Sequence, residues 1–282
     1  MNTVPRAASA GEQAVARKAT DPTALRIARA GFAARGAVYI IVGWLALLAA
    51  FTGASATDKQ GALESIGQLP QGSILVGAVA AGLFAYAAWS LVRAVFDPER
   101  RGHDAKGLLT RVSYAVAGLS YAGVAFGAAR FALGSGSAGK SSDASTQDWT
   151  ARLLQAPFGP PLVIAIGVIF VCVAAMEFAK AYSASFLKDL RLHDLGAEVR
   201  RWVERVGRAG LAARGVVFAL IGLFLIQASR QHDPSTAVGL GGALNKLAEQ
   251  PYGQVLLGIV AAGLCMYGLF SLVEARYLQL KR

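Results

Sequence analysis

Six long stretches without a charged residue constrain the fold of this 282-residue chain more than any other feature of its sequence. The stretches run over residues 36–57, 72–92, 112–129, 153–176, 215–229 and 250–273. A helix needs about 20 apolar residues to cross the hydrocarbon core of a membrane. Charged residues make up 16% of the chain, which is below the roughly 25% usual for a soluble domain. The sequence therefore predicts an all-α, polytopic membrane protein with six transmembrane helices.

The Lys and Arg residues are distributed unevenly between the two sides of these helices. Segments 1–35, 93–111, 180–214 and the carboxyl-terminal tail carry 22 of them, and the segments on the other side carry 6. Basic residues favour the cytoplasmic side, so we expect a multi-pass protein of the cytoplasmic (inner or plasma) membrane with both termini in the cytoplasm. The same segments account for the net charge of +11, and no nucleic-acid partner is expected. Residues 1–28 lack the apolar core of a secretory signal, so no cleaved leader is expected.

The chain contains internal repeats. Residues 29–43 (RAGFAARGAVYIIVG) and 208–222 (RAGLAARGVVFALIG) are identical at nine of fifteen positions, and residues 61–94 match 242–275 at 17 of 34. A weaker middle copy lies between them. We therefore predict three tandem two-helix repeats of parallel topology. The predicted parts are a cytoplasmic tail (1–28), repeat 1 (29–101, helices at about 36–54 and 72–93), repeat 2 (102–190, helices at about 112–132 and 158–181) and repeat 3 (191–282, helices at about 211–229 and 252–274).

The repeated residues carry a family resemblance. Both outer repeats combine an AARG element with a later Pro-x-Gly turn and a GL…Y pattern. These motifs resemble the bacterial integral membrane family catalogued as domain of unknown function 1206, over roughly residues 28–276 in three copies. The resemblance implies a six-helix membrane protein and assigns no activity. The middle copy departs from the pattern, since Ala117 stands where the outer copies have Arg35 and Arg214.

Six polar side chains in or beside the spans are candidates for binding lipid or substrate, or for locking helices together: Arg35, Arg214, Glu177, Lys180, Tyr86 and Tyr267. Arg35 and Arg214 occupy matching positions, where each is either a positive-inside anchor or a ligand for an anionic headgroup or substrate. Glu177 is either a functional intramembrane carboxylate or an ion pair with Lys180, Arg214 or Arg35. Glu274 is expected to be a solvated charge at a helix end.

The sequence lacks the motifs of enzymes and metal sites. Its three His lie in connecting segments, and its two Cys lie in apolar stretches without a CxxC pattern. HExxH, P-loop and GxSxG motifs are not found. We therefore expect no catalytic residue, no cofactor-binding residue and no metal ligand, and we predict that the protein is not an enzyme.

A basic segment before the fifth span has the pattern of an amphipathic helix. Leu192, Leu195, Val199, Trp202 and Val206 are spaced three or four residues apart and have arginines beside them. This pattern predicts a helix on the cytoplasmic leaflet, where anionic lipid headgroups or a cytoplasmic protein would bind.

Small residues four apart predict close packing of helices in the bilayer. Such pairs are Gly123 with Gly127, Ala78 with Gly82, and Gly258 with Ala262. Packing within one bundle is the first interpretation, and formation of a homo-oligomer is the alternative.

Two functions remain open at this point. The spans hold almost no ionisable side chains outside their ends, which favours a non-enzymatic structural or interaction protein whose partner is the bilayer or a cytoplasmic protein. The alternative is a small-solute transporter or channel with a path between the three repeats. A transporter requires the candidate polar residues to converge on one cavity, whereas a scaffold does not.

Overall fold

Six long helices dominate the computed structural model, which describes residues 22–53, 55–56, 58–68, 71–96, 105–134, 141–190 and 196–277. They are α2 (Pro22–Thr52), α4 (Gly72–Phe96), α5 (Ala105–Ala132), α7 (Gly159–Ser183), α8 (Ala197–Gln231) and α10 (Gly253–Tyr277). Within these ranges, six helices are long and apolar enough to cross a membrane. The predicted all-α fold with six spans in a polytopic membrane protein is confirmed.

Several helices run further than the charge-free stretches that predict them. Helix α2 begins at Pro22 rather than near 36, because a helix accepts charged residues at a membrane surface. Helix α8 continues without a break from Ala197 through the fifth span. The predicted amphipathic segment is therefore the first part of α8 and not a separate helix. Its Leu192 and Leu195, the tail 1–21 and residues 278–282 lie outside the described residues.

A short helix joins the two long helices of every repeat, where the sequence predicts only a connecting loop. These helices are α3 (Lys59–Gly67), α6 (Ser142–Leu154) and α9 (Leu240–Ala248). The side chains of Asp58 and Ser141 accept hydrogen bonds from backbone N–H groups at the starts of α3 and α6, which stabilises these ends. Each repeat is thus a long helix, a short helix and a returning long helix. We call the end of the bundle with the short helices the short-helix end, and the opposite end the basic end.

The Pro-x-Gly turn has the same geometry in each repeat. The residue between proline and glycine adopts the left-handed conformation, with φ of 61°, 61° and 60° at Gln71, Phe158 and Tyr252. The following glycine packs against the carbonyl oxygens that end the short helix. A Cβ atom at Gly253 would lie 2.0 Å from the Ala248 carbonyl oxygen. Glycine is required here because only it allows so close an approach.

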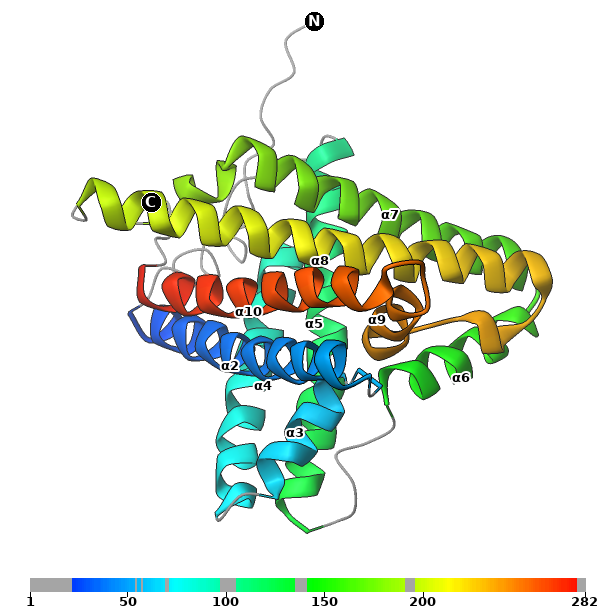
Figure 1. The fold of residues 1–282 in the computed structure, drawn as a ribbon, viewed down its shortest axis with the longest axis horizontal. Coiled ribbons are helices and arrows are strands. Elements are labelled where there is room, and N and C mark those ends of the chain that lie inside the picture. The colour runs from blue at the N-terminus through cyan, green and yellow to red at the C-terminus, as the bar shows by residue number, and fades with distance from the viewer. Residues whose placement is uncertain are drawn as a thin grey trace, which may run out of the picture.

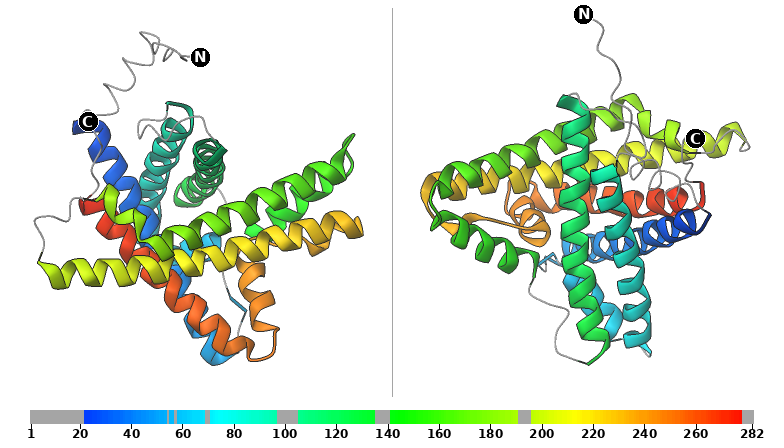
Figure 2. Two further views of the ribbon diagram at one scale, coloured as in Figure 1. Left: turned by 90° about the horizontal axis from the view of Figure 1, so that it is seen from above. Right: turned by 180° about the vertical axis from the view of Figure 1, so that it is seen from behind.

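The six long helices form three antiparallel pairs, and each pair combines two different repeats. Helix α4 packs along α5, α7 along α8, and α10 along α2, so the last repeat closes back onto the first. The pairs run in different directions and cross one another (Figures 1 and 2). Glycines allow close contact within two of these pairs. A Cβ at Gly36 would lie 2.8 Å from the Gly268 carbonyl oxygen, and one at Gly167 would lie 2.8 Å from that of Gly222.

The middle repeat is more open than the outer two. Helices α2 and α4 pack together within repeat 1, and α8 and α10 within repeat 3, whereas α5 and α7 of repeat 2 contact each other at few residues. One predicted packing residue lies in this gap. A Cβ at Gly123 of α5 would meet no atom within 4 Å, so the prediction that Gly123 packs tightly against another helix in the bundle is wrong.

Candidate functional site

The candidate polar residues occupy equivalent positions of the three repeats. In the returning helices, Tyr86, Ser90 and Arg93 of α4 correspond to Val173, Glu177 and Lys180 of α7 and to Tyr267, Ser271 and Glu274 of α10. In the outgoing helices, Arg35 and Tyr39 of α2 correspond to Ala117 and Tyr121 of α5 and to Arg214 and Phe218 of α8. The crossing of the helix pairs brings these positions together.

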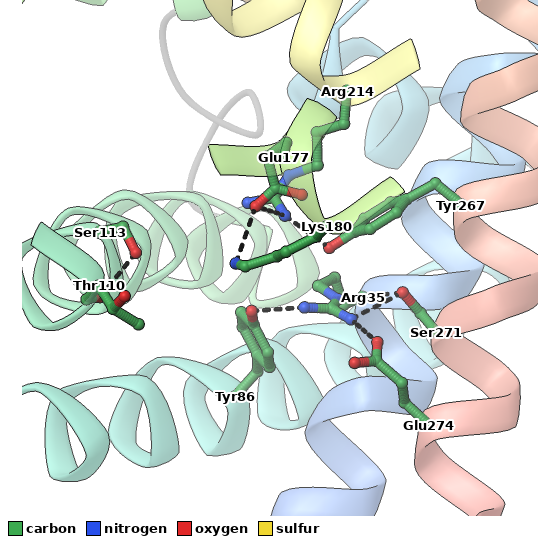
Figure 3. Close-up of polar contacts among 10 residues, drawn as sticks. All are labelled: Arg35, Tyr86, Thr110, Ser113, Glu177, Lys180, Arg214, Tyr267, Ser271 and Glu274. Atoms are coloured by element: carbon green, nitrogen blue, oxygen red, sulfur yellow. Dashed lines mark hydrogen bonds and ion pairs between the residues drawn. The ribbon is translucent and has the colours of Figure 1, made fainter. Parts of the chain in front are cut away.

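Arg35 is buried and fully engaged by other side chains. Its Nη1 donates a hydrogen bond to the Tyr86 hydroxyl at 2.5 Å, and its Nε and Nη2 donate to Ser271 Oγ at 3.1 and 2.8 Å. Its Nη2 also forms an ion pair with Glu274 Oε2. The guanidinium carbon lies 4.7 Å from the centre of the Phe32 ring. Arg35 therefore joins α2 to α4 and α10 (Figure 3).

Arg214 occupies the matching position but is held more loosely. Its Nη1 donates to the Tyr267 hydroxyl at 2.9 Å, and this bond is the repeat equivalent of the bond between Arg35 and Tyr86. The same Nη1 lies 3.5 Å from Glu177 Oε1, which Lys180 Nζ also approaches at 3.5 Å. Arg214 and Glu177 thus form an ion pair at the upper end of the usual distance range.

Among the six candidate residues, two buried side-chain atoms have no hydrogen-bond partner within the described ranges: Glu177 Oε2 and Arg214 Nε. A buried polar atom without a partner costs about 1–3 kcal/mol, so native proteins normally satisfy such atoms with water or a ligand. Arg214 and Glu177 are therefore the two candidate residues with spare hydrogen-bonding capacity.

The middle repeat differs from the other two. Ala117 and Val173 replace the arginine and the tyrosine together, so the middle repeat has no equivalent of the bond from Arg35 to Tyr86. Arg93 of α4 instead faces α5, with its guanidinium carbon 3.8 Å from the centre of the Tyr114 ring. The repeat symmetry of the polar cluster is thus broken in the middle repeat.

These side chains surround a cavity of about 180 Å³ where the helix pairs cross, which we call the central cavity. All six predicted candidates line it: Arg35, Tyr86, Glu177, Lys180, Arg214 and Tyr267. The cations in its lining are Arg35, Lys59, Arg93, Lys180 and Arg214, and the carboxylates are Glu177 and Glu274. Among the described residues that line it, five positive charges therefore face two negative ones.

The interpretation of Glu177 as an ion pair with Lys180 and Arg214 agrees with these distances. The expectation for Glu274 is wrong, since its side chain is 21% exposed and pairs with Arg35. A helix-end position does not reveal that a neighbouring helix buries the carboxylate.

Sequence reasoning missed two residues of the site. Ser271 accepts hydrogen bonds from Arg35. Lys59 of α3 lines the central cavity and places its Nζ 4.2 Å from the centre of the Tyr121 ring. Ser271 is detectable as the repeat equivalent of Glu177, whereas nothing in the sequence indicates that a short helix brings Lys59 to the centre.

Within the described ranges, no group of three or more His, Cys, Asp or Glu side chains is placed to hold a metal ion. Cys172 and Cys265 are free thiols. The chemistry available in the central cavity is that of guanidinium, ammonium, phenol, hydroxyl and carboxylate groups.

Comparison with known proteins gives the family but no activity. The model of the family described as Domain of Unknown Function (DUF1206) matches residues 30–97, 112–184 and 209–278. A curated relative, the uncharacterized protein YxxB of Bacillus subtilis (strain 168), is 34% identical over 258 residues, which is 92% of each chain. No solved structure matches this chain. The chain is therefore a member of the DUF1206 family and carries three copies of its domain.

Proposed function

We propose that the protein is a carrier for a small anionic solute, which binds in the central cavity between the three repeats. The observation that supports this function most directly is the excess of cations among the charged side chains that line the cavity. A buried cluster of positive charges is costly in a membrane protein unless an anion compensates it. The proposal requires no chemical step, and it treats the protein as non-enzymatic.

The proposal includes a topology. The basic end faces the cytoplasm and the short-helix end faces outward, in the cytoplasmic membrane, with both termini in the cytoplasm. The uneven distribution of Lys and Arg supports this orientation.

The two central arginines have different roles in the proposal. The donors of Arg35 are taken up by Tyr86, Ser271 and Glu274, which makes Arg35 a structural link. Arg214 retains an unpartnered Nε and an ion pair at 3.5 Å. An entering anion therefore binds Arg214, with Lys180 as the second cation, and loosens their contact with Glu177.

The convergence of the six candidate side chains on one cavity favours the carrier over a scaffold. A scaffold gains nothing from placing Arg214, Glu177 and Lys180 around a common space, and a packed apolar axis would be more stable. A carrier needs a polar site that it can expose to either side.

The test measures binding and flux of defined anions. The purified protein is reconstituted in lipid nanodiscs for calorimetric titration with butyrate and inorganic phosphate, and in proteoliposomes for uptake of the same labelled anions. Arg214→Gln should weaken binding and uptake of the bound anion at least tenfold, because a charge-assisted contact contributes about 1.5–3 kcal/mol. Arg214→Lys should retain part of both.

Arg208→Gln is the matched control. Arg208 lies on the same helix, is half-exposed and pairs with Glu204 at 2.7 Å. This variant should bind and transport like the wild type. Absence of binding and uptake for both anions in the folded wild-type protein would exclude the proposed function, and equal loss in both variants would exclude the role of Arg214.

A second candidate function is an interaction surface on the first part of α8. Val199 and Trp202 are 47% and 49% exposed there, next to Arg200 and Arg201. Apolar and basic groups on one helix favour an anionic lipid surface. Phosphatidylglycerol in the nanodiscs should raise the Tm of the wild type relative to phosphatidylcholine, and the double variant Arg200→Gln, Arg201→Gln should lose that increase. An equal increase in both proteins would argue against this surface.

A further inference from the structure

A second cavity lies beside the central one, in the gap between the two long helices of the middle repeat. It has a volume of about 590 Å³ and lies between α5, α6, α7 and α8, and we call it the lateral cavity. Its walls are mainly apolar, with Val124, Val163, Ile166, Ile221 and Leu225 among the lining residues. This volume lies within the roughly 300–1,000 Å³ of small-molecule sites.

The lateral cavity and the central cavity meet. Both are lined by Tyr39, Lys59, Ser120, Phe170, Arg214 and Phe218. The junction therefore has cations, Lys59 and Arg214, at the point where an apolar space begins. Arg214 is the residue with the unpartnered Nε.

The lateral cavity opens toward the outside of the bundle. Leu119 and Phe126 of α5 line it and are themselves exposed. Gly123 lies one turn from each of them, and a Cβ there would meet no atom within 4 Å. Free space thus reaches the backbone of α5 and continues to the surface that faces lipid.

The middle repeat accounts for the apolar character on this side. Ala117 and Val173 remove the arginine and the tyrosine that the outer repeats place beside the central cavity. At these two positions the middle repeat contributes apolar side chains, while its Glu177 and Lys180 still line the central cavity.

We propose that the solute is an amphiphilic anion with a single hydrocarbon chain. Its carboxylate or phosphate group binds Arg214 and Lys180 as in the proposed function, with Lys59 as a further cation at the junction, and its chain lies in the lateral cavity. This inference rests on the proposed function and specifies the class of anion. At about 30 Å³ for each water-sized group, the cavity holds roughly 20 non-hydrogen atoms, which is enough for one chain but not for the two chains of a phospholipid.

The test compares chain lengths with one headgroup. Butyrate, decanoate and the uncharged decanol are titrated into the protein in zwitterionic nanodiscs, with empty nanodiscs as the reference for partition and affinities expressed per free aqueous ligand. Burial of apolar surface strengthens binding roughly fourfold for each methylene. Decanoate should therefore bind at least tenfold more tightly than butyrate, and also more tightly than decanol.

A substitution that fills the lateral cavity provides the second measurement. Gly123→Leu should remove the preference for decanoate while leaving butyrate binding unchanged. Gly77→Leu is the control, since a Cβ at Gly77 of α4 meets only Ala132 Cβ at 3.7 Å and does not line either cavity. This variant should keep the wild-type preference.

The outcomes separate this inference from the proposed function. If butyrate and decanoate bind equally well, the chain site is excluded while the anion site stands. If neither carboxylate binds, the chain site is excluded, and the anion site is excluded as well when inorganic phosphate also fails to bind. Displacement of decanoate by phosphatidylglycerol at equal membrane concentration would overturn the assignment of a single-chain ligand, and no displacement would support it.

Discussion

The ion pair of Arg35 with Glu274 should stabilise the closure of the last repeat onto the first. The side chains are 5% and 21% exposed, so both charges lose most of their hydration. Removing one partner of a buried pair costs about 3–5 kcal/mol, because the other charge stays buried and uncompensated. Arg35→Gln and Glu274→Gln should each lower the free energy of unfolding by about 3 kcal/mol. The double variant should lose about 1–3 kcal/mol less than the sum, as coupled neighbours do.

The pair of Arg214 with Glu177 offers a matched comparison in the same protein. Its closest atoms are 3.5 Å apart, and Glu177 shares its oxygen with Lys180. The same double-mutant cycle should therefore give a smaller coupling energy, about 1 kcal/mol or less. Reversible unfolding in mixed micelles, followed by circular dichroism against the mole fraction of dodecyl sulfate, measures both cycles. A coupling energy near zero for Arg35 with Glu274, or a larger one for Arg214 with Glu177, would refute this reasoning.

Two further predictions concern the short-helix end. Gly253→Ala should lower the free energy of unfolding by about 1–3 kcal/mol, because its Cβ would lie 2.0 Å from a carbonyl oxygen. Gly258→Ala on the same helix should be neutral or stabilising by up to about 1 kcal/mol. The Tm values of both variants in one detergent check these predictions. Hydrogen bonds from Ser235 lower the pKa of Asp233 below its ordinary value of 3.8. A group whose pKa is lowered in the folded state stabilises the fold above its unfolded pKa. The backbone amides of residues 235–237 should therefore be protected from hydrogen exchange above pH 3.8, and this protection should decline as the pH falls below it. In Asp233→Asn this decline should disappear; an unchanged pH profile would contradict the assignment.

The long helices were predictable because a membrane-spanning helix requires a long apolar stretch of sequence. A span such as α4 must be apolar over its whole circumference, and this requirement is visible without a structure. The short helices have no comparable sequence pattern. Helices α3 and α9 are nine residues long and mix polar with apolar side chains, so their formation depends on packing against the long helices.

The site was predictable in part for a related reason. A buried charge such as Arg35 or Glu177 interrupts an apolar stretch and is recognisable by its cost. Glu274 lies near the end of its helix, where a charged residue is normally exposed to water and costs little free energy. Its burial follows only from the contact of α10 with α2, which the sequence does not show. Alignment of the repeats gives an indication that Glu274 belongs to the site, since it corresponds to Lys180 and Arg93.

The divergence of the middle repeat follows from the energetics of the Arg–Tyr hydrogen bond. Loss of only one member would leave a buried donor or acceptor unsatisfied, at about 1–3 kcal/mol. Replacement of both members, by Ala117 and Val173, avoids that cost and removes two large side chains from one side of the centre. A bundle with three identical repeats would place an Arg–Tyr pair on every side of its centre. The asymmetric bundle leaves Arg214 incompletely satisfied beside an apolar cavity, which is the arrangement that an anion with an apolar chain would complete.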